Sequence, residues 1–499
     1  MKSLDYVYQR RERKNLIPAY VIVVFICLIN MSSAIAVNWL MLQGTEHPFA
    51  PEHKFLGLIQ PAYTYDTSDN LSGLTDSPGP PDFSSNNGER LAITSVSPWF
   101  DDNNKFHIRR AKFGVRGIFT GTLRSRFTSK MNYLALFEVA PNLMTYDPFG
   151  ERARVIALDH LSLTFNHISG ARIRTGLFKT PGPDEALQGV HTLDYIELTD
   201  FTAREVLERF VTGAAVPAGS PSSPQLGIPE NTAYGINAVR DWGAQVFDSF
   251  NSDQWDLSYA VMLGRGEAIQ EKNTANDNIE LHLYTSAEYG LPGGIGPGKN
   301  GLKFYGWYQN GKREFSTDTN KNEYDRKRYG IGSKLLGRFF ASKYKYRLGV
   351  ELMFADGMIF ISPAGGVANG NVNNGNLQIA AESGNKSRGA TLDLGFYPNN
   401  KWQFDLRFHQ HNMLHQTAAT INPGNERILN DTTLGLNYHF SRKIRLTFNY
   451  IFRNMKAPTS YSSTTGFPPA DISAGITSNV NTIVNTVEDR ILLQLTWIL

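Results

Sequence analysis

The chain has 499 residues, of which 41% are hydrophobic and 12% aromatic, with 44 glycines and a single cysteine, Cys27. Its 49 basic and 46 acidic residues give a net charge of +3, but residues 1–36 hold five of the bases and two of the acids, which leaves 44 of each. This neutral remainder gives no sign of nucleic-acid binding, and a sequence without cysteine after Cys27 excludes disulfides, thiolate metal sites and cysteine nucleophiles there.

Residues 1–36 have the pattern of an export signal. Basic residues precede an apolar run over residues 16–29, and Ala34-Ile35-Ala36 is a small-x-small cleavage site. The alternative is a single membrane-anchoring helix, because the apolar run is of marginal length for one. After cleavage, residues 37–53 are expected to form a short N-terminal segment in the periplasm. This segment is too short for a folded plug domain of the kind that active transporters have.

From residue 54 onwards, segments of alternating apolar and polar residues predict strands. They cover residues 54–66, 106–119, 124–138, 154–166, 170–180, 238–250, 253–264, 278–289, 300–312, 323–336, 339–354, 387–397, 401–413, 429–440, 443–454 and 486–499. Each is close to the length of a tilted membrane-spanning strand, about ten residues or slightly more. In the last segment Ile491, Leu493, Leu495, Trp497 and Leu499 share one face, and a face of this kind is typical of a strand between lipid and water. Residues 54–499 therefore predict an all-β fold, a single transmembrane antiparallel β-barrel of about sixteen strands.

The links between these segments alternate in length. Long links cover residues 67–105, 139–153, 181–237, 265–277, 313–322, 355–386, 414–428 and 455–485, and the seven links between them are short. Bacterial outer-membrane barrels have long external loops and short periplasmic turns. An even number of strands places both ends of such a barrel in the periplasm.

Two segments carry a resemblance to a known family. They are HIRRAKFGVRG at His107–Gly117 and RIRTGLFKTP at Arg172–Pro181, with the acidic Glu185 shortly after. Over residues 105–187, about a sixth of the chain, the sequence resembles the phosphate-selective porins O and P. The resemblance implies a sixteen-stranded outer-membrane porin, usually a trimer, whose third external loop folds into the pore. The link 181–237 occupies the place of that loop.

The polar register of the strands predicts a basic pore wall. Eighteen bases lie on it, namely Arg110, Lys112, Arg116, Arg126, Lys130, Arg172, Arg174, Arg328, Lys334, Lys343, Lys345, Arg347, Lys401, Arg407, Lys443, Arg445, Arg453 and Arg490. Ten acids share the register, namely Glu138, Asp241, Asp256, Glu280, Glu288, Glu351, Asp393, Asp405, Asp431 and Glu488. A basic wall raises the local concentration of anions, and arginine suits phosphate or carboxylate because its planar fork binds two oxygens. The alternative for each of these residues is that it pairs with an opposite charge of the wall and serves only to keep the lumen hydrated.

The third loop has the opposite charge. Its acids are Asp184, Glu185, Asp194, Glu197, Asp200, Glu205 and Glu208, against Arg204 and Arg209. An acidic loop would repel phosphate or pair with arginines across the constriction, so the phosphate selectivity of the family is not carried over. The sequence predicts a porin for passive diffusion of small solutes in the outer membrane of a Gram-negative bacterium, with a weak preference for anions.

The sequence leaves other function classes open beside this porin. A barrel that sheathes a multihaem cytochrome in an electron conduit is the alternative, and it needs a partner because the chain has no haem attachment motif. An enzyme is not expected, and neither a cofactor nor a metal is, although His409, His411 and His415 resemble a metal cluster. The expected partners are outer-membrane lipid and lipopolysaccharide, the barrel-assembly machinery, two further copies in a homotrimer, and small anionic solutes.

Overall fold

The computed structural model describes most of the chain after the expected export signal. The described residues are 38–47, 49–76, 84, 87–88, 104–119, 125–142, 144–145, 155–207, 211–212, 233–234, 239–252, 254–266, 279–293, 299–316, 321–338, 343–361, 378–419, 421–462 and 470–499. The predicted signal peptide, residues 1–36, and the predicted site residue Glu208 lie outside them.

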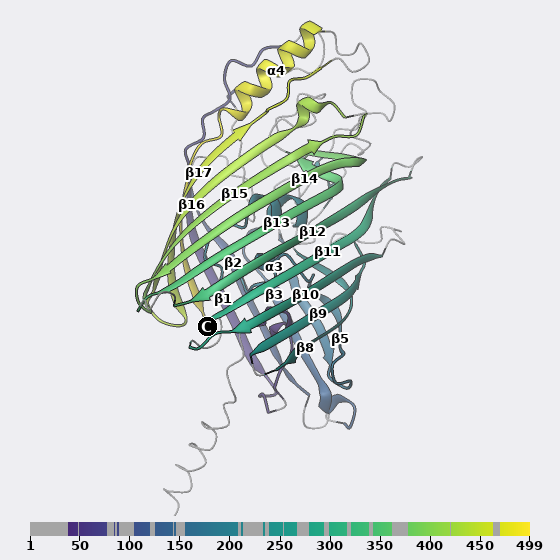
Figure 1. Ribbon diagram of the computed structural model, residues 1–499, viewed down its shortest axis with the longest axis vertical. Helices are drawn as coiled ribbons and strands as arrows, with labels where there is room; N and C mark the ends of the chain where they lie inside the picture. The colour runs from purple at the N-terminus through teal and green to yellow at the C-terminus, as the bar shows by residue number, and fades with distance from the viewer. Residues whose placement is uncertain are drawn as a thin grey trace, which may run out of the picture.

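Sixteen antiparallel strands form a closed barrel, in which each strand pairs with its neighbours along the chain and β1 pairs with β18 (Figure 1). Two short strands, β6 (Val211–Thr212) and β7 (Ala233–Tyr234), form a separate ladder. The barrel strands are β1 (Lys54–Asp66), β2 (Asn104–Ile118), β3 (Met131–Glu138), β4 (Ala157–Phe165), β5 (Arg172–Lys179), β8 (Arg240–Asn251), β9 (Trp255–Gly264), β10 (Glu280–Gly290), β11 (Gly301–Ser316), β12 (Lys321–Gly337), β13 (Lys345–Ile361), β14 (Gln378–Tyr397), β15 (Trp402–Gln416), β16 (Arg427–His439), β17 (Ile444–Lys456) and β18 (Arg490–Ile498). The predicted fold is confirmed.

Each predicted strand coincides with one strand of the barrel, and the errors lie at the ends. The third was expected from residue 124, but β3 begins at Met131, after a 3-10 turn at Thr128–Lys130. β14 begins at Gln378 rather than at residue 387. The strands β3, β4 and β5 have 8, 9 and 8 residues, whereas β14 has 20, so the barrel wall differs in height around its circumference (Figure 1).

Side chains alternate between the interior and the outer surface, as a strand requires. On β18 the side chains of Arg490, Gln494 and Thr496 are buried, whereas Leu493 and Trp497 are 40% and 46% exposed. The outward-facing surface is therefore apolar, and the inward-facing surface is largely polar.

A helix lies at the end of the barrel where the long loops gather (Figure 1). Helix α4 (Ala470–Val484) buries Ile476 and Val480 in a cluster with Leu71 and Leu74, which follow β1. The Asn479 side chain also bonds the backbone of Thr75 in both directions, at 2.7 and 3.1 Å. The link expected over residues 455–485 thus contains a helix that fastens the first long loop to the last. None of the helices among the described residues is long and apolar enough to cross a membrane.

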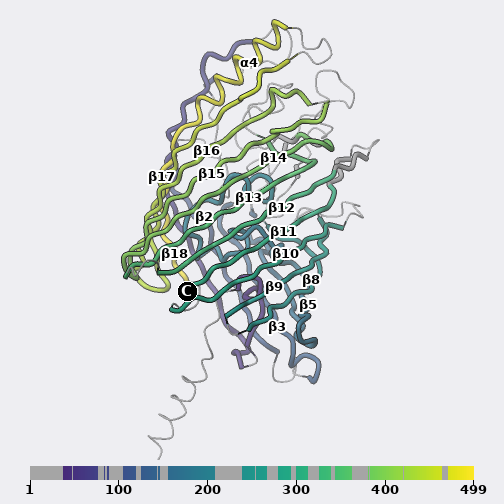
Figure 2. The backbone as a smooth tube through the Cα atoms, viewed as in Figure 1, coloured from purple at the N-terminus to yellow at the C-terminus, as the bar shows by residue number. Residues whose placement is uncertain are grey.

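Two segments outside the strands enter the barrel. Residues 38–47, with the short helix α2 (Trp39–Leu42), form the dark purple trace in Figure 2 and contact inward-facing side chains of β2, β3, β5 and β9. Residues 180–207, with α3 (Asp184–Leu187) and the π-helical turn η4 (Thr202–Val206), follow β5 and contact the opposite wall.

Candidate functional site

The described part of the third loop is held inside the barrel by ion pairs between its acids and bases of the wall. Every acid of the loop that the structure describes has a base within 4 Å. The pairs are Asp184 with Lys303 (2.7 Å) and Lys334 (3.8 Å), Glu185 with Arg407 (3.9 Å), Asp194 with Arg347 (2.6 Å), Glu197 with Arg490 (3.0 Å) and Arg109 (3.8 Å), Asp200 with Arg204 and His411 (both 2.7 Å), and Glu205 with Arg328 (3.2 Å). The loop acids are thus largely neutralised by the basic wall.

Arg347 on β13 is the centre of one such attachment. Its guanidinium is 2.6 Å from Asp194 of the loop, 2.8 Å from Asp393 on β14 and 2.9 Å from Asp405 on β15. The side chain of Arg347 is 1% exposed. One arginine therefore joins the loop to three adjacent strands through charge-assisted bonds, which are the strong class of hydrogen bond.

Backbone groups of the loop are bound to the wall as well. Arg445 donates to the carbonyl of Leu193 at 2.7 Å, and the backbone N–H of Ile196 donates to the side chain of Asn449 at 2.8 Å. Arg328 donates to the carbonyl of Glu205 at 2.7 Å. The path of the loop is thus fixed at several points along its described length.

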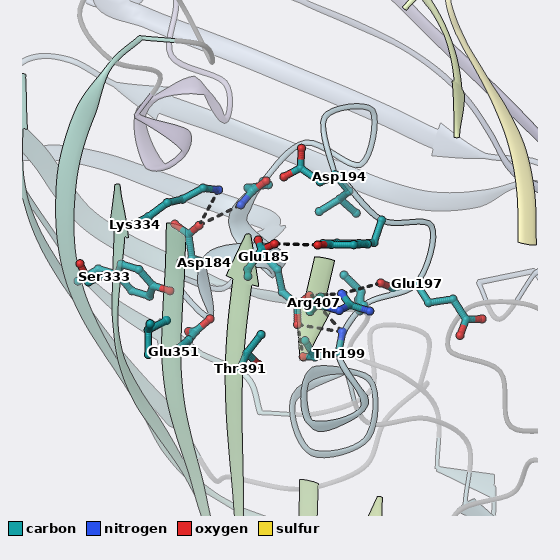
Figure 3. Close-up of a pocket in the computed structure, with 18 residues that line it drawn as sticks. Asp184, Glu185, Asp194, Glu197, Thr199, Ser333, Lys334, Glu351, Thr391 and Arg407 are labelled. Atoms are coloured by element: carbon teal, nitrogen blue, oxygen red, sulfur yellow. Dashed lines mark hydrogen bonds and ion pairs between the residues drawn. The ribbon is translucent and has the colours of Figure 1, made fainter. Parts of the chain in front are cut away.

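A cavity of about 80 Å³ remains between the loop and the wall (Figure 3). Asp184, Glu185 and Thr199 face it from the loop, and Lys334 and Glu351 face it from β12 and β13. A cavity of this volume has room for only a few water molecules. It is bounded on one side by the third loop and on the other by the barrel wall.

A larger cavity of about 730 Å³ lies at the short-turn end of the barrel and shares Gln188, Asp194 and Lys334 with the first. Its lining is strongly basic. Eight bases line it, namely Lys334, Arg338, Lys343, Lys345, Arg347, Arg442, Lys443 and Arg445, and the single acid in its lining is Asp194. We call this cavity the basic vestibule. Since Asp194 is paired with Arg347, the cavity has a large excess of positive charge.

A second basic cluster lies on the other side of the loop, around a cavity of about 60 Å³. Lys112 and Arg240 both contact Asp159, at 2.6 and 3.1 Å, while the ammonium of Lys179 donates to the carbonyl of Ala186 at 2.7 Å. Arg110 also lines the cavity and donates to Gln60 at 3.0 Å. Four bases and the acids Glu138, Asp159 and Glu185 thus surround one enclosed space.

A β-bulge places two consecutive arginines in the lumen. The pairing of β1 with β2 passes from Gln60–Arg110 to Pro61–Ile108, so Arg109 is an extra residue. Both arginines are buried, Arg109 at 1% and Arg110 at 5% exposure. Strict alternation would have turned Arg109 outward, and for that reason it was missing from the predicted site. Pro61 lacks the N–H that regular pairing uses, and a proline inside a strand signals such a bulge.

The other predicted wall residues fall into two groups. Among those facing the interior, Arg174 is fully buried and Arg116 and Arg172 partly so, while Arg172 also pairs with Asp248. Arg126 and Lys130 lie in the turn before β3 and are exposed, because the strand begins at Met131. Sequence reasoning missed Lys303, Lys179 and Arg240, which lie on segments with weak alternation or at strand ends.

Two of the three histidines that resemble a metal cluster in the sequence, His409 and His411, contact the third loop. His411 contacts Asp200 of the loop at 2.7 Å and Ser387 of β14 at 2.7 Å. His409 accepts from the backbone N–H of Phe201 at 3.3 Å. Both therefore bind the third loop to β15.

Comparisons with known proteins identify no family for this chain. The chain matches no family model and no curated protein. Among the solved structures that are similar to it are the following three. They are OmpF of Salmonella typhi in complex with daunomycin (12% identity, TM-score 0.46, covering 90% of this chain and 97% of that one), an anion-selective porin from Comamonas acidovorans (11%, 0.44, 90% and 99%) and the outer-membrane channel DcaP of Acinetobacter baumannii (11%, 0.41, 92% and 100%). Such low identities and scores carry no functional conclusion for this chain.

The ion pairs predict how attachment of the loop depends on pH. Burial alone would raise the pKa of Asp184 and Glu197, but Lys303 and Arg490 outweigh it and hold both pKa values below the usual range. A carboxyl with a depressed pKa stabilises the folded state above its unfolded pKa of about 4, and that contribution is lost as the pH falls through the folded pKa. We expect the contribution of these two pairs to loop attachment to be constant from about pH 8 to pH 5 and to fall only below about pH 4. A pH series in planar bilayers that compares the parent with an Asp184→Asn, Glu197→Gln variant measures this, and a difference between the two that disappears near pH 6.5 would contradict it.

Proposed function

We propose that the chain is an outer-membrane porin, a water-filled channel for passive diffusion of small solutes with a weak preference for anions. The observation that best supports this proposal is the closed barrel with an apolar outer surface and a largely polar interior. Outward side chains such as Phe408 and Leu434 are 42% and 45% exposed, while inward Asn437 and Asn449 are buried. A soluble protein seldom exposes so continuous an apolar surface, whereas a membrane barrel requires it.

The loop lengths give the barrel its orientation in this proposal. Short turns belong to the periplasmic side of outer-membrane barrels and long loops to the external side. The basic vestibule is then the periplasmic mouth, and α4 lies on the external side. The expected export signal of residues 1–36 agrees with this arrangement.

The uneven distribution of charge supports the anion preference. The third-loop acids are paired with wall bases, so their fields are largely cancelled. In the basic vestibule, Arg338, Lys343, Arg442 and Lys443 are exposed and have no carboxylate within 4 Å among the described residues. Unpaired charges at a pore mouth attract counter-ions most strongly. A solute that leaves the narrow cavity therefore enters a region that favours anions.

The family assignment is part of the proposal. The resemblance to the phosphate-selective porins O and P rests on residues 107–117 and 172–181, and both segments contribute bases to the lumen. Membership implies a homotrimer. The enclosed cluster of Arg110, Lys112, Lys179 and Arg240 supports binding of oxyanions by such a pore.

The electron-conduit alternative receives no support from the lumen. A multihaem cytochrome inside the barrel would need the space that residues 184–207 occupy. Those residues are bound to the wall by the ion pairs described above.

The closing strand gives one test of the membrane assignment. Leu499 is 64% exposed, and its N–H donates to the carbonyl of Gly57 across the closure at 3.0 Å. Leu499→Asp puts a carboxylate on the lipid side, and we expect the yield of folded barrel in membranes to fall several-fold. Leu499→Phe should preserve or improve the yield. Heat-modifiable mobility of outer-membrane fractions measures both, and normal insertion of the Asp variant would count against a lipid-facing closure.

Conductance tests the proposed function itself. Purified full-length protein added to a planar bilayer in 1 M KCl should give step-like increases in current without any partner. Protein that inserts, as shown by protease protection, but gives no current steps would overturn the proposal.

A further inference from the structure

The N-terminal segment, residues 38–47, lies across basic side chains of the inner wall. The Asn38 side chain donates to Ser258 on β9, and Glu46 pairs with Arg116 on β2. The backbone N–H of Glu46 donates to Asn132 on β3 at 3.1 Å. Between these attachments, Leu40 is 2% exposed and belongs to the apolar cluster of the interior. The segment is therefore fastened at its two ends and packed in the middle.

Arg174 on β5 lies under this segment in an unusual environment. Its side chain is 0% exposed, and its guanidinium is 4.2 Å from the ring centre of Phe247. Its hydrogen bonds are long and go to neutral oxygens, including the carbonyl of Leu40 and the hydroxyl of Thr45, both at 3.4 Å. Among the described residues, no carboxylate is within ion-pair distance of Arg174. A buried charge without a counter-ion is costly.

Arg116 lies beside the same part of the segment and has a counter-ion. It donates to the carboxylate of Glu46 and, at 3.1 Å, to the carbonyl of Thr45. Arg116 and Arg174 thus both contact Thr45, one through its carbonyl and the other through its hydroxyl. Among the residues that the structure describes, the carboxylate at this point is that of Glu46, which belongs to the segment itself and contacts Arg116 but not Arg174.

We propose that residues 38–47 form a tethered plug, and that displacing it opens a binding site for an oxyanion between Arg116 and Arg174. Glu46 occupies part of that site in the closed state. A phosphate or carboxylate group from the lumen replaces Glu46 on Arg116 and supplies the counter-ion that Arg174 lacks. Arginine pairs suit such groups because each guanidinium presents two parallel donors.

The plug also reaches the basic vestibule. Trp39 lines the basic vestibule and lies near Gly189 of the third loop, so the segment spans from the β2–β5 wall to that loop. Solutes are confined to the vestibule side while the plug is in place. Oxyanions then control a second route through the barrel, a function that rests on the proposed channel.

The test measures displacement of the plug with inorganic phosphate as the probe. The reporter is Leu40→Cys in a full-length Cys27→Ser chain reconstituted in liposomes, since a side chain 2% exposed is labelled by a thiol reagent only when the plug lifts. At constant ionic strength and pH 7, phosphate in place of chloride should speed labelling about tenfold. Met41→Cys is a second reporter, which separates displacement of the plug from a local effect at Leu40.

Three variants test the contacts that the proposal assigns to Glu46 and Arg174. Glu46→Gln should label about tenfold faster already in chloride, because a charge-assisted bond is lost. Glu52→Gln is the matched control, since Glu52 is exposed and lies outside the plug, and it should label like the parent. Arg174→Gln should remove the response to phosphate.

The outcomes separate this proposal from the proposed function. Labelling that is unaffected by both phosphate and Glu46→Gln would overturn the plug and leave the channel standing. Labelling that responds to phosphate in a protein that carries no current in bilayers would overturn the channel and leave the plug standing. Fast labelling of the parent chain in chloride would overturn the closed state.

Discussion

Replacing Arg347 with methionine should release the third loop from the wall and give the largest change in conductance of any single substitution. Arg347 is 1% exposed and contacts Asp194, Asp393 and Asp405. Without it, one carboxylate of the loop and two of the wall lose their common cation, and removing one partner of a buried pair typically costs about 3–5 kcal/mol. We expect a larger and noisier single-channel conductance and a lower temperature of barrel unfolding in detergent.

Two further variants make this result interpretable. Arg347→Lys keeps the charge but loses the planar fork, so it should lie between the parent and the methionine variant. Arg338→Met removes an exposed arginine of the basic vestibule and should leave unfolding unchanged. Conductance and unfolding of Arg347→Met that equal those of Arg338→Met would show that the third loop does not depend on this attachment.

Removing the unpaired charges of the basic vestibule should abolish the preference for anions. A combined variant replaces four bases with glutamine, namely Arg338, Lys343, Arg442 and Lys443. It leaves every ion pair of the third loop intact. We expect the anion-to-cation permeability ratio at 0.1 M salt to fall about threefold. The fall should be smaller at 1 M salt, where the screening length is about 3 Å rather than about 10 Å.

A matched pair of single variants controls for charge alone. Lys443 immediately precedes β17 and Lys456 is its last residue, and both are exposed. Lys443→Gln should lower the permeability ratio more than Lys456→Gln does, because only Lys443 lines the vestibule. Equal effects of the two variants would mean that total charge, rather than the vestibule, sets selectivity.

The sequence predicted the barrel well because its two signals are local. Alternation along β18 and the alternating loop lengths depend on neighbouring residues, and they identified all sixteen strands. The bulge at Arg109 was not predicted, because an extra residue shifts the register and the apolar pattern around it is weak. Pro61 on the facing strand was the signal that could have revealed it.

The candidate site was less predictable, because it depends on contacts between distant segments. The acids of the third loop were visible in the sequence, but their partners lie on strands up to 293 residues away, as Glu197 and Arg490 show. Residues 38–47 were expected as a periplasmic segment, and their contacts with Arg116 and Arg174 have no sequence pattern. Those contacts join residues 70 and 134 positions apart.

The reversal potential of the unmodified protein shows directly whether the pore prefers anions. In a planar bilayer with a tenfold KCl gradient, an anion-preferring pore gives a reversal potential displaced toward the chloride equilibrium potential. The basic vestibule predicts a displacement of that sign, modest in size and larger at low salt. A displacement toward the potassium equilibrium potential would contradict an anion preference, because it would mean that the acids of the third loop, rather than the bases of the vestibule, govern the pore.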